Sequence, residues 1–333
     1  MASLNFDLSG IPVSIATQAP QLLQLYADYF RYYSPAVFAD SKKTLIRIEL
    51  KLQATLPDSI IDQEAKLISR AGVVEFWRAS EQRRESFYLK TNVSIFRLTP
   101  ETGRVVGIIS VAALNAPNLL VNTYTFAALQ FMLRRFQRYH LHTAAVISPG
   151  KNLHLICGGQ RAGKTTLTTA LGVAGWQPIS DDGVLLQERE PGKPRLQAFK
   201  RDFHLTAELL QKWPELHNVT SRHDYQDRSC INGLELFATE KLADNFFAQI
   251  DSIIFPTITH EPESRLETIS ASAAIPLLIE QSMYFPLWQE HTKLQIKLLS
   301  ELVKGAACLR LLAGRDIWEN PHCAALLLEN SPA

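Results

Sequence analysis

The alternation of apolar and polar positions divides the chain into two parts. Alternating residues bounded by turn formers predict strands over residues 9–17, 44–52, 73–80, 85–99 and 104–113. Between the first two of these strands, residues 21–33 place apolar side chains at helical spacing. The last three strands follow one another closely, and a turn at 100–103 joins the final pair, which predicts antiparallel pairing. Residues 1–120 are therefore predicted to form an α+β module.

The second part, residues 121–333, has the pattern of an α/β domain. A helix is predicted to begin at Asn122 and to run to residue 140, followed by a β-hairpin that leads into a glycine-rich loop. A helix from Thr165 to Ala174 follows the loop and stops at Gly175. Apolar spacing further downstream predicts helices over residues 292–312 and 325–333.

Composition and charge narrow the classes of function. The 34 basic and 33 acidic side chains give a formal net charge of +1, so no global field attracts nucleic acid or an anionic membrane. No stretch reaches the roughly 18 apolar residues that a spanning helix needs. The four cysteines show neither zinc-ligand nor C-x-x-C spacing. We expect a cytoplasmic protein with reduced thiols and with neither nucleic-acid nor membrane partners.

The clearest motif is the glycine-rich loop, which begins after an apolar strand and ends in a helix. Gly158, Gly163, Lys164 and Thr165 fit the pattern G-x-x-x-x-G-K-[ST] of a phosphate-binding loop. Its backbone N–H groups can surround the phosphates of ATP, the lysine can reach the β- and γ-phosphates, and the threonine hydroxyl can bind Mg²⁺. The predicted nucleotide-binding residues are Gly158, Gly159, Gln160, Arg161, Ala162, Gly163, Lys164, Thr165 and Thr166.

Two adjacent aspartates, Asp181 and Asp182, follow one helix and one short strand after this loop. Neighbouring side chains on a strand point to opposite sides, so one carboxylate can bind Mg²⁺ while the other accepts the proton of an incoming hydroxyl. Alternatively, the aspartates and Gly183 form only a turn. Asp251, next to an apolar run, is a second candidate for the aspartate that binds magnesium in many phosphate-loop ATPases.

The loop, the aspartate pair and His142 together resemble the core of bacterial HPr kinase/phosphorylase, whose fold is shared with phosphoenolpyruvate carboxykinase. The resemblance covers roughly residues 140–185, and a weaker similarity extends to the segment around Arg265. It implies an HPr-kinase-like P-loop kinase domain over residues 121–333. Because HPr kinases form hexamers, it also leaves a homo-oligomer open.

Transferred residue by residue, the resemblance implies roles for the matching positions. Asp181 resembles the acid/base residue and Asp182 the metal-side carboxylate together with Thr165, although the sequence leaves the reverse assignment open. His142 would orient an aspartate or contact the γ-phosphate, with His140 as the second choice. Arg265 corresponds to the arginine of the family's mobile capping loop, and Lys164 keeps its phosphate-binding role.

Departures from the family narrow the predicted reaction. The chain lacks the E-x-R-G signature that follows the active site of HPr kinases, so the resemblance does not extend to phosphorylase activity or to HPr as substrate. It is more similar to divergent members, which include kinases that phosphorylate serine on ribosomally made peptides during lasso-peptide maturation. In that subgroup Arg201 is a candidate contact to phosphate or substrate.

The function predicted from these features is transfer of the γ-phosphate of ATP to a serine of a peptide or protein. Two alternatives stay open: a kinase of the same fold that acts on free serine or a sugar, and a nucleotide-gated binding module without phosphotransfer. In the nucleotide-gated binding module, the polar segment 211–228 would move when the nucleotide binds or is hydrolysed. Its Arg222, His223, Tyr225 and Arg228 are candidate contacts to a peptide or phosphate.

Overall fold

In the computed structural model, the chain forms two compact units, Met1–Gln137 and Arg138–Ala333. The boundary lies later in the chain than the predicted one at residue 120. The structure describes residues 1–8, 10–30, 33, 35, 45–57, 61–81, 84–190, 192–199, 202–219, 223–225, 228–237, 246–247, 249–282 and 288–330. Within these ranges, no helix is long and apolar enough to cross a membrane.

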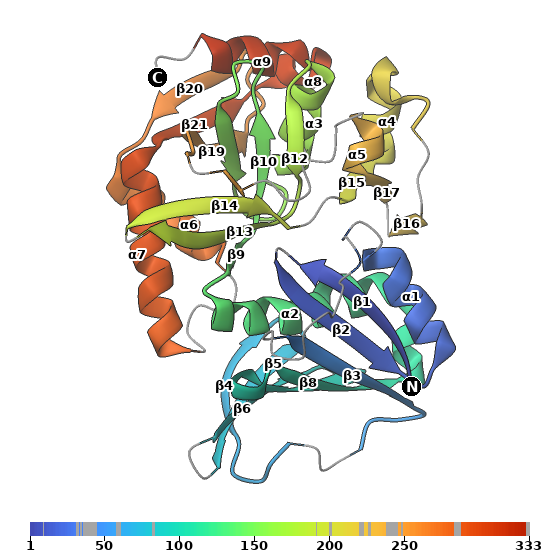
Figure 1. The fold of residues 1–333 in the computed structure, drawn as a ribbon. Coiled ribbons are helices and arrows are strands. Elements are labelled where there is room, and N and C mark those ends of the chain that lie inside the picture. Colours follow the sequence, from blue (N-terminus) through green and yellow to red (C-terminus); the bar gives the residue numbers. More distant parts are fainter. Residues whose placement is uncertain are drawn as a thin grey trace. The chain divides into compact units, whose positions relative to one another are not determined.

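The first unit is built on an eight-stranded sheet with the order β1-β2-β3-β8-β7-β6-β5-β4 (Figure 1). Its strands are β1 (Ala2–Leu8), β2 (Ile11–Thr17), β3 (Ile46–Gln53), β4 (Lys66–Ala71), β5 (Val74–Glu81), β6 (Arg84–Lys90), β7 (Ser94–Thr99) and β8 (Arg104–Ser110). The strands from β4 to β8 pair antiparallel with one another, whereas β3 pairs parallel with both β2 and β8. The predicted strand over 85–99 is thus two strands, β6 and β7.

Helices in the first unit include one element that the sequence assigned to the second domain. Helix α1 (Pro20–Phe30) packs on β1 and β2, and short 3₁₀ turns cover Pro100–Thr102 and Val111–Asn115. A π-helical segment (Leu119–Thr125), α2 (Phe126–Leu133) and a 3₁₀ turn (Arg134–Phe136) then form one helical stretch. The helix predicted to reach residue 140 therefore ends earlier, because residues 139–141 form a strand. All side chains of α2 are buried, so this helix packs into the core of the first unit.

The second unit is built on a six-stranded sheet with the order β12-β10-β11-β19-β21-β20. Its strands are β10 (Thr143–Ile147), β11 (Leu153–Cys157), β12 (Gln177–Ser180), β19 (Ser252–Ile258), β20 (Arg265–Thr268) and β21 (Ala307–Ala313). The predicted hairpin before the loop is confirmed, since β10 and β11 pair antiparallel from Thr143↔Cys157 to Ile147↔Leu153. Strands β11, β19 and β21 run parallel.

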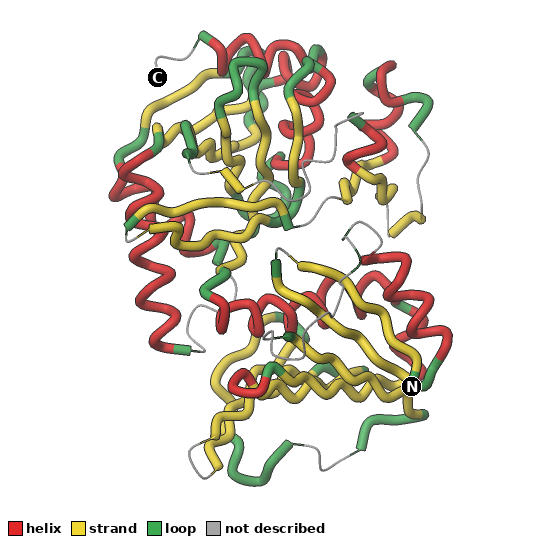
Figure 2. Tube along the Cα trace, in the orientation of Figure 1, coloured by secondary structure: helices red, strands yellow, loops and turns green. Residues whose placement is uncertain are grey.

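Two smaller sheets and several helices complete the second unit (Figure 2). One sheet has the order β18-β14-β13-β9 and contains β9 (Tyr139–Leu141), β13 (Val184–Glu190), β14 (Lys193–Ala198) and β18 (Phe246–Phe247). The other contains β15 (Asp202–Thr206), β16 (His223–Tyr225) and β17 (Arg228–Asn232). The helices are α3 (Lys164–Val173), α4 (Ala207–Lys212), α5 (Gly233–Leu236), α6 (Ala271–Glu280), α7 (Gln289–Gly305), α8 (Arg315–Glu319) and α9 (His322–Glu329), with a 3₁₀ turn at Pro214–Leu216.

The six-stranded sheet separates two apolar cores. On one face it packs with α6, α7 and the inner face of the β13–β14 hairpin, and on the other with α3, α4, α8 and α9. Alternate residues of each strand serve the two cores, so Leu155 belongs to the first and Ile156 to the second. The helix predicted over residues 292–312 is wrong at its end. Residues 307–313 form the parallel strand β21, because a short apolar run buried on both faces has no period that separates strand from helix.

Candidate functional site

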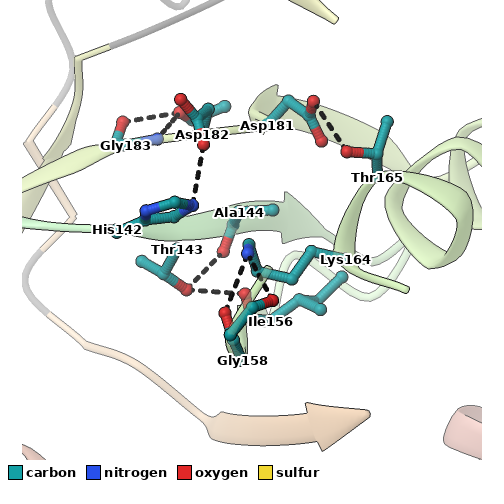
Figure 3. A network of polar contacts seen from close by, with 12 residues as sticks. His142, Thr143, Ala144, Ile156, Gly158, Lys164, Thr165, Asp181, Asp182 and Gly183 are labelled. Atoms are coloured by element: carbon teal, nitrogen blue, oxygen red, sulfur yellow. Dashed lines mark hydrogen bonds and ion pairs between the residues drawn. The ribbon is translucent and has the colours of Figure 1, made fainter. Parts of the chain in front are cut away.

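The glycine-rich loop connects the end of β11 to the first residue of α3 (Figure 3). Gly163 adopts a left-handed conformation with φ 95° immediately before the helix, and Arg161 has φ 65°. A Cβ added at Gly158 would lie 2.8 Å from the Cβ of Ala162, so only glycine allows the loop to close here. Gly159 has no such contact. The glycines therefore allow the backbone to turn tightly before α3, and the positive end of the helix dipole lies at the loop.

Lys164 is the first residue of α3, and its side chain folds back over the loop. Its Nζ donates hydrogen bonds to the carbonyl oxygens of Gly158 at 2.8 Å and Gly159 at 3.2 Å. Only 8% of the residue is exposed. An ammonium group held at this position brings positive charge to the space where loop amides and the helix terminus already favour an anion.

Thr165 links the glycine-rich loop to the aspartate pair. Its Oγ1 donates to Oδ2 of Asp181 at 3.0 Å (Figure 3). Asp181 follows the last residue of β12, an edge strand that pairs with β10, and this pairing brings the carboxylate to the N-terminus of α3. One helix, α3, and one strand, β12, therefore separate the loop from the aspartates along the chain and return the chain to the loop.

Asp181 is a buried acid whose pKa is raised. It is 2% exposed. Burial, followed by the charge of neighbouring Asp182, raises the pKa of Asp181 to about 7. The hydroxyl of Thr165, the charge of Lys164 and the backbone N–H of His204 act against this rise. Its Oδ1 makes no hydrogen bond with the described parts of the chain. A buried carboxylate oxygen with unused capacity is suited to a cation.

Asp182 points the other way, toward His142. Oδ1 of Asp182 lies 2.9 Å from Nε2 of His142, and each side chain is about one-third exposed, at 33% and 35%. The backbone N–H of His142 donates to the carbonyl oxygen of Gln281, which holds the residue at the end of β9. Ser180 Oγ donates to the carbonyl oxygen of Gly183 at 2.6 Å, so the aspartates lie in a tight turn. A tight turn at residues 180–183 is therefore compatible with separate roles for the two aspartates.

Beneath the loop, the ends of β10 and β11 are held together by Thr143. Its Oγ1 donates to the carbonyl oxygen of Ile156 at 2.8 Å and lies 2.9 Å from Sγ of Cys157. Burial raises the pKa of the Cys157 thiol to about 12, so the thiol stays protonated. Sequence reasoning did not single out this pair, because nothing in a threonine and a cysteine fourteen positions apart indicates a contact before the hairpin register is known.

Two candidate residues lie away from this group. Asp251 is level with Leu153, the first residue of β11, and its Oδ2 accepts a hydrogen bond from the Leu153 N–H at 2.8 Å. Asp251 therefore lies at the opposite end of β11 from the loop, where its carboxylate accepts a hydrogen bond from the strand backbone. Arg265 lies on β20, beyond β19 and β21, and Nη1 pairs with Oε2 of Glu261 at 2.6 Å. No contact between Arg265 and the loop or the aspartates is found among the described residues.

Some of the remaining candidate residues belong to the described part of the chain, and others lie outside it. His140 is buried on β9, and its ring packs edge-on against Phe199 at 5.6 Å between centroids. Arg201 and Arg222 lie outside the described residues, and the side chains of His223, Tyr225 and Arg228 are outside them too. The backbone of His204, which the sequence did not indicate, contacts Asp181. Among the residues predicted from the sequence, only Arg201, between β14 and β15 in the chain, indicated this region.

The donor set fits Mg²⁺ bound together with nucleotide phosphates. The described residues contain no group of three or more His, Cys, Asp and Glu side chains arranged to hold a metal alone. Mg²⁺ commonly takes one or two carboxylates and completes its shell with phosphate oxygens and water. The open oxygen of Asp181, the hydroxyl of Thr165 and the closed backbone at Gly158 meet that requirement.

Comparisons with known proteins add little to this geometry. The chain matches no family model and no curated protein. Among solved structures it is similar to the HPr(Ser) kinase/phosphatase from Coxiella burnetii, with 15% sequence identity and a TM-score of 0.31, over 57% of this chain and 94% of that chain. A likeness this weak carries no argument, so the functional conclusion rests on the site itself.

Proposed function

We propose that the protein is an ATP-dependent phosphotransferase that transfers the γ-phosphate to a hydroxyl group, namely a serine of a peptide or protein such as a ribosomally made precursor. One observation carries the proposal. At the N-terminus of α3, a buried aspartate bonds to the threonine of a phosphate-binding loop, and a second aspartate beside it pairs with a histidine. This arrangement supplies a place for the phosphates and a place for an acceptor at adjacent points.

The donor side is formed by the loop. Backbone N–H groups between Gly159 and Thr165 and the ammonium group of Lys164 would hold the β- and γ-phosphates. Thr165 Oγ1 and the open Oδ1 of Asp181 would hold Mg²⁺, which offsets the phosphate charge when bound. The raised pKa of Asp181 is consistent with this role, because a buried carboxylate becomes favourable when a cation lies against it.

The acceptor side is formed by Asp182 and His142. The acceptor oxygen attacks the γ-phosphorus, the bond from that phosphorus to the β–γ bridging oxygen breaks, and ADP leaves. Asp182 accepts the proton of the acceptor hydroxyl, and the 2.9 Å contact with His142 orients the carboxylate. This assigns Asp181 to the metal side and Asp182 to proton transfer, the reverse of the assignment that the resemblance implied.

Arg265 has no place in the proposed machinery as the chain is folded. Its guanidinium pairs with Glu261 and lies 3.7 Å from Oε1 of Glu267, so it would have to leave these carboxylates to reach the phosphates. Strand β20 is separated from β11 by two strands, a distance of about 14 Å at the usual spacing of strands. The proposal therefore stands without a capping arginine.

The test is incubation of the full chain with Mg²⁺ and γ-labelled ATP, together with serine peptides and small hydroxyl compounds, followed by mass analysis. We expect label on serine in a peptide. Asp182→Asn should lower kcat with little change in the KM for ATP, whereas Asp181→Asn should weaken the Mg²⁺ dependence of nucleotide binding.

Other outcomes would sink parts of the proposal. Normal transfer by Asp181→Asn and Asp182→Asn would contradict the mechanism. Label on free serine or a sugar in preference to peptides would identify a small-molecule kinase. ATP-dependent partner binding without any labelled acceptor, retained when Asp182 is replaced, would identify a nucleotide-gated binding module instead.

A further inference from the structure

Strands β11 and β19 are parallel neighbours in the six-stranded sheet, and the helices that follow them pack on opposite faces. Helix α3, which follows β11, packs in one apolar core, whereas α6 and α7, which follow β19, pack in the other. In open α/β sheets, ligands bind beyond the carboxyl ends of the strands at such a junction. Here the glycine-rich loop lies on one side of the junction, and the residues that end β19 lie on the other.

Ile258 is the last residue of β19, and its side chain lies against the loop. A Cβ added at Gly163 would be 3.3 Å from Cγ1 and 3.5 Å from Cδ1 of Ile258. The earlier residues of the strand, from Ser252 to Pro256, are buried, whereas Ile258 is 57% exposed. Single exposed apolar side chains are common on protein surfaces, but this one borders the loop at the junction where a ligand is expected.

The backbone after Ile258 is held by hydrogen bonds to the end of β21. The N–H of Thr259 donates to the carbonyl oxygen of Ala313 at 2.8 Å, and Oγ1 of Thr259 donates to the same oxygen at 3.1 Å. The N–H of Gly314 donates to Oγ of Ser264 at 2.8 Å. The backbone position of Ile258 is therefore set before any ligand packs on its side chain, which lowers the cost of binding.

The strand order places Ile258 and the proposed acceptor groups on opposite sides of the loop. In the order β12-β10-β11-β19, the aspartates follow β12, His142 precedes β10, and the loop follows β11. Strands β12 and β11 run in the same direction, since both pair antiparallel with β10, so these groups meet at one edge of the sheet. In Figure 3, the aspartates and Gly158 lie on opposite sides of Lys164.

The geometry of phosphate transfer then decides which side the nucleoside occupies. The attacking oxygen, the phosphorus and the leaving oxygen lie roughly in line in this reaction. With the acceptor on the β12 side of the loop, the leaving ADP extends toward β19. Its phosphates need the amides and the ammonium group of the loop, whereas the faces of the base and the ribose are apolar enough to pack on an aliphatic side chain.

We propose that Ile258 packs against the nucleoside of the phosphate donor, so that the site selects a nucleoside triphosphate over an inorganic polyphosphate. This inference rests on the proposed function and adds the contact that recognises the donor. An aliphatic side chain has no hydrogen-bonding group, so it supports adenine and guanine alike. ATP and GTP should therefore gain the same affinity from Ile258.

The test measures Kd by calorimetry for the full chain with Mg²⁺ and either inorganic tripolyphosphate or the β,γ-imido analogues of ATP and GTP, which do not transfer phosphate. The wild type should bind both analogues more tightly than tripolyphosphate. Ile258→Ala should raise the Kd of both analogues by about tenfold, because it removes apolar surface that the nucleoside covers. The Kd of tripolyphosphate should stay unchanged.

Two further variants keep the result interpretable. Ile258→Leu retains an apolar side chain of the same volume and should bind the analogues as the wild type does. Ile296→Ala is the matched control, because it removes the same atoms from another exposed isoleucine, on α7. It should change none of the Kd values. Both isoleucines are exposed, so truncation of either should leave the fold intact.

The failures of the two proposals are distinguishable. Analogues that bind no more tightly than tripolyphosphate, or equally to wild type and Ile258→Ala, would overturn the nucleoside contact, while labelled acceptor would still support the kinase. A raised KM for a serine peptide with unchanged Kd for the analogues would place the acceptor at Ile258 and overturn the inference. If neither the analogues nor tripolyphosphate bind, the loop is not a phosphate site and both proposals are wrong.

Discussion

Replacement of Asp181 by asparagine should make the metal-free protein more stable, by an amount that grows with pH. The folded-state pKa of Asp181 is raised from the usual value of 3.8 to about 7, so between these values the folded chain holds a proton that the unfolded chain has lost. Stability from this group is complete below the unfolded pKa and is lost as pH rises toward the folded pKa. At about 1.36 kcal/mol per pH unit, the full loss is on the order of 4 kcal/mol.

Asparagine does not titrate, so the stability difference between Asp181→Asn and wild type follows this loss. From about pH 5 to about pH 8, the advantage of the variant should grow by roughly 2–3 kcal/mol and then level off. Urea unfolding in the presence of a chelator, followed by tryptophan fluorescence, measures it, because Trp176 and Trp213 are buried in the second unit. Asp251→Asn makes the same chemical change at the far end of β11 and is the control. A stability advantage that stays constant across this pH range would refute the burial argument.

Three other predictions follow from local packing. Gly158→Ala should destabilise the second unit by about 1–3 kcal/mol in urea unfolding, since its Cβ would lie 2.8 Å from that of Ala162, whereas Gly159→Ala should not, because nothing lies within 4 Å. Cys323 is partly exposed while the other three cysteines are buried, so a thiol reagent should modify it first in the native protein, as peptide mapping would reveal. Asp251→Ala should lower stability by about 1 kcal/mol and leave kcat for phosphate transfer unchanged, because its carboxylate serves a strand N–H, and a large loss of kcat would return it to the metal site.

The loop and its surroundings could be predicted because their signals are local. Glycine at fixed positions, a lysine and a threonine specify a backbone conformation and a helix start, and the hairpin before them has turn residues between two apolar runs. The structure confirms both the hairpin and the helix that stops at Gly175. The sequence also placed the aspartates one helix and one strand after the loop, but it grouped Thr165 with Asp182, whereas Thr165 bonds to Asp181.

The errors have a different physical origin. The apolar run in 307–313 lies between neighbours on both sides of a sheet, and burial on both faces removes the alternation that marks a surface strand. The helix predicted from residue 122 was too long for a related reason. Helix α2 is buried on all sides, so its sequence has no polar face that would show where the helix ends.

The most direct test of the central claim is the amount of γ-phosphate that reaches a serine hydroxyl, compared between wild type, Asp182→Asn and Asp251→Asn under the same Mg²⁺ and ATP concentrations. The two substitutions are chemically identical, but Asp182 pairs with His142, whereas Asp251 accepts a hydrogen bond from the N–H of Leu153. We expect labelled serine with wild type and Asp251→Asn, and a loss of about a hundredfold or more with Asp182→Asn. Equal labelling by all three proteins, or release of free phosphate alone, would contradict the account.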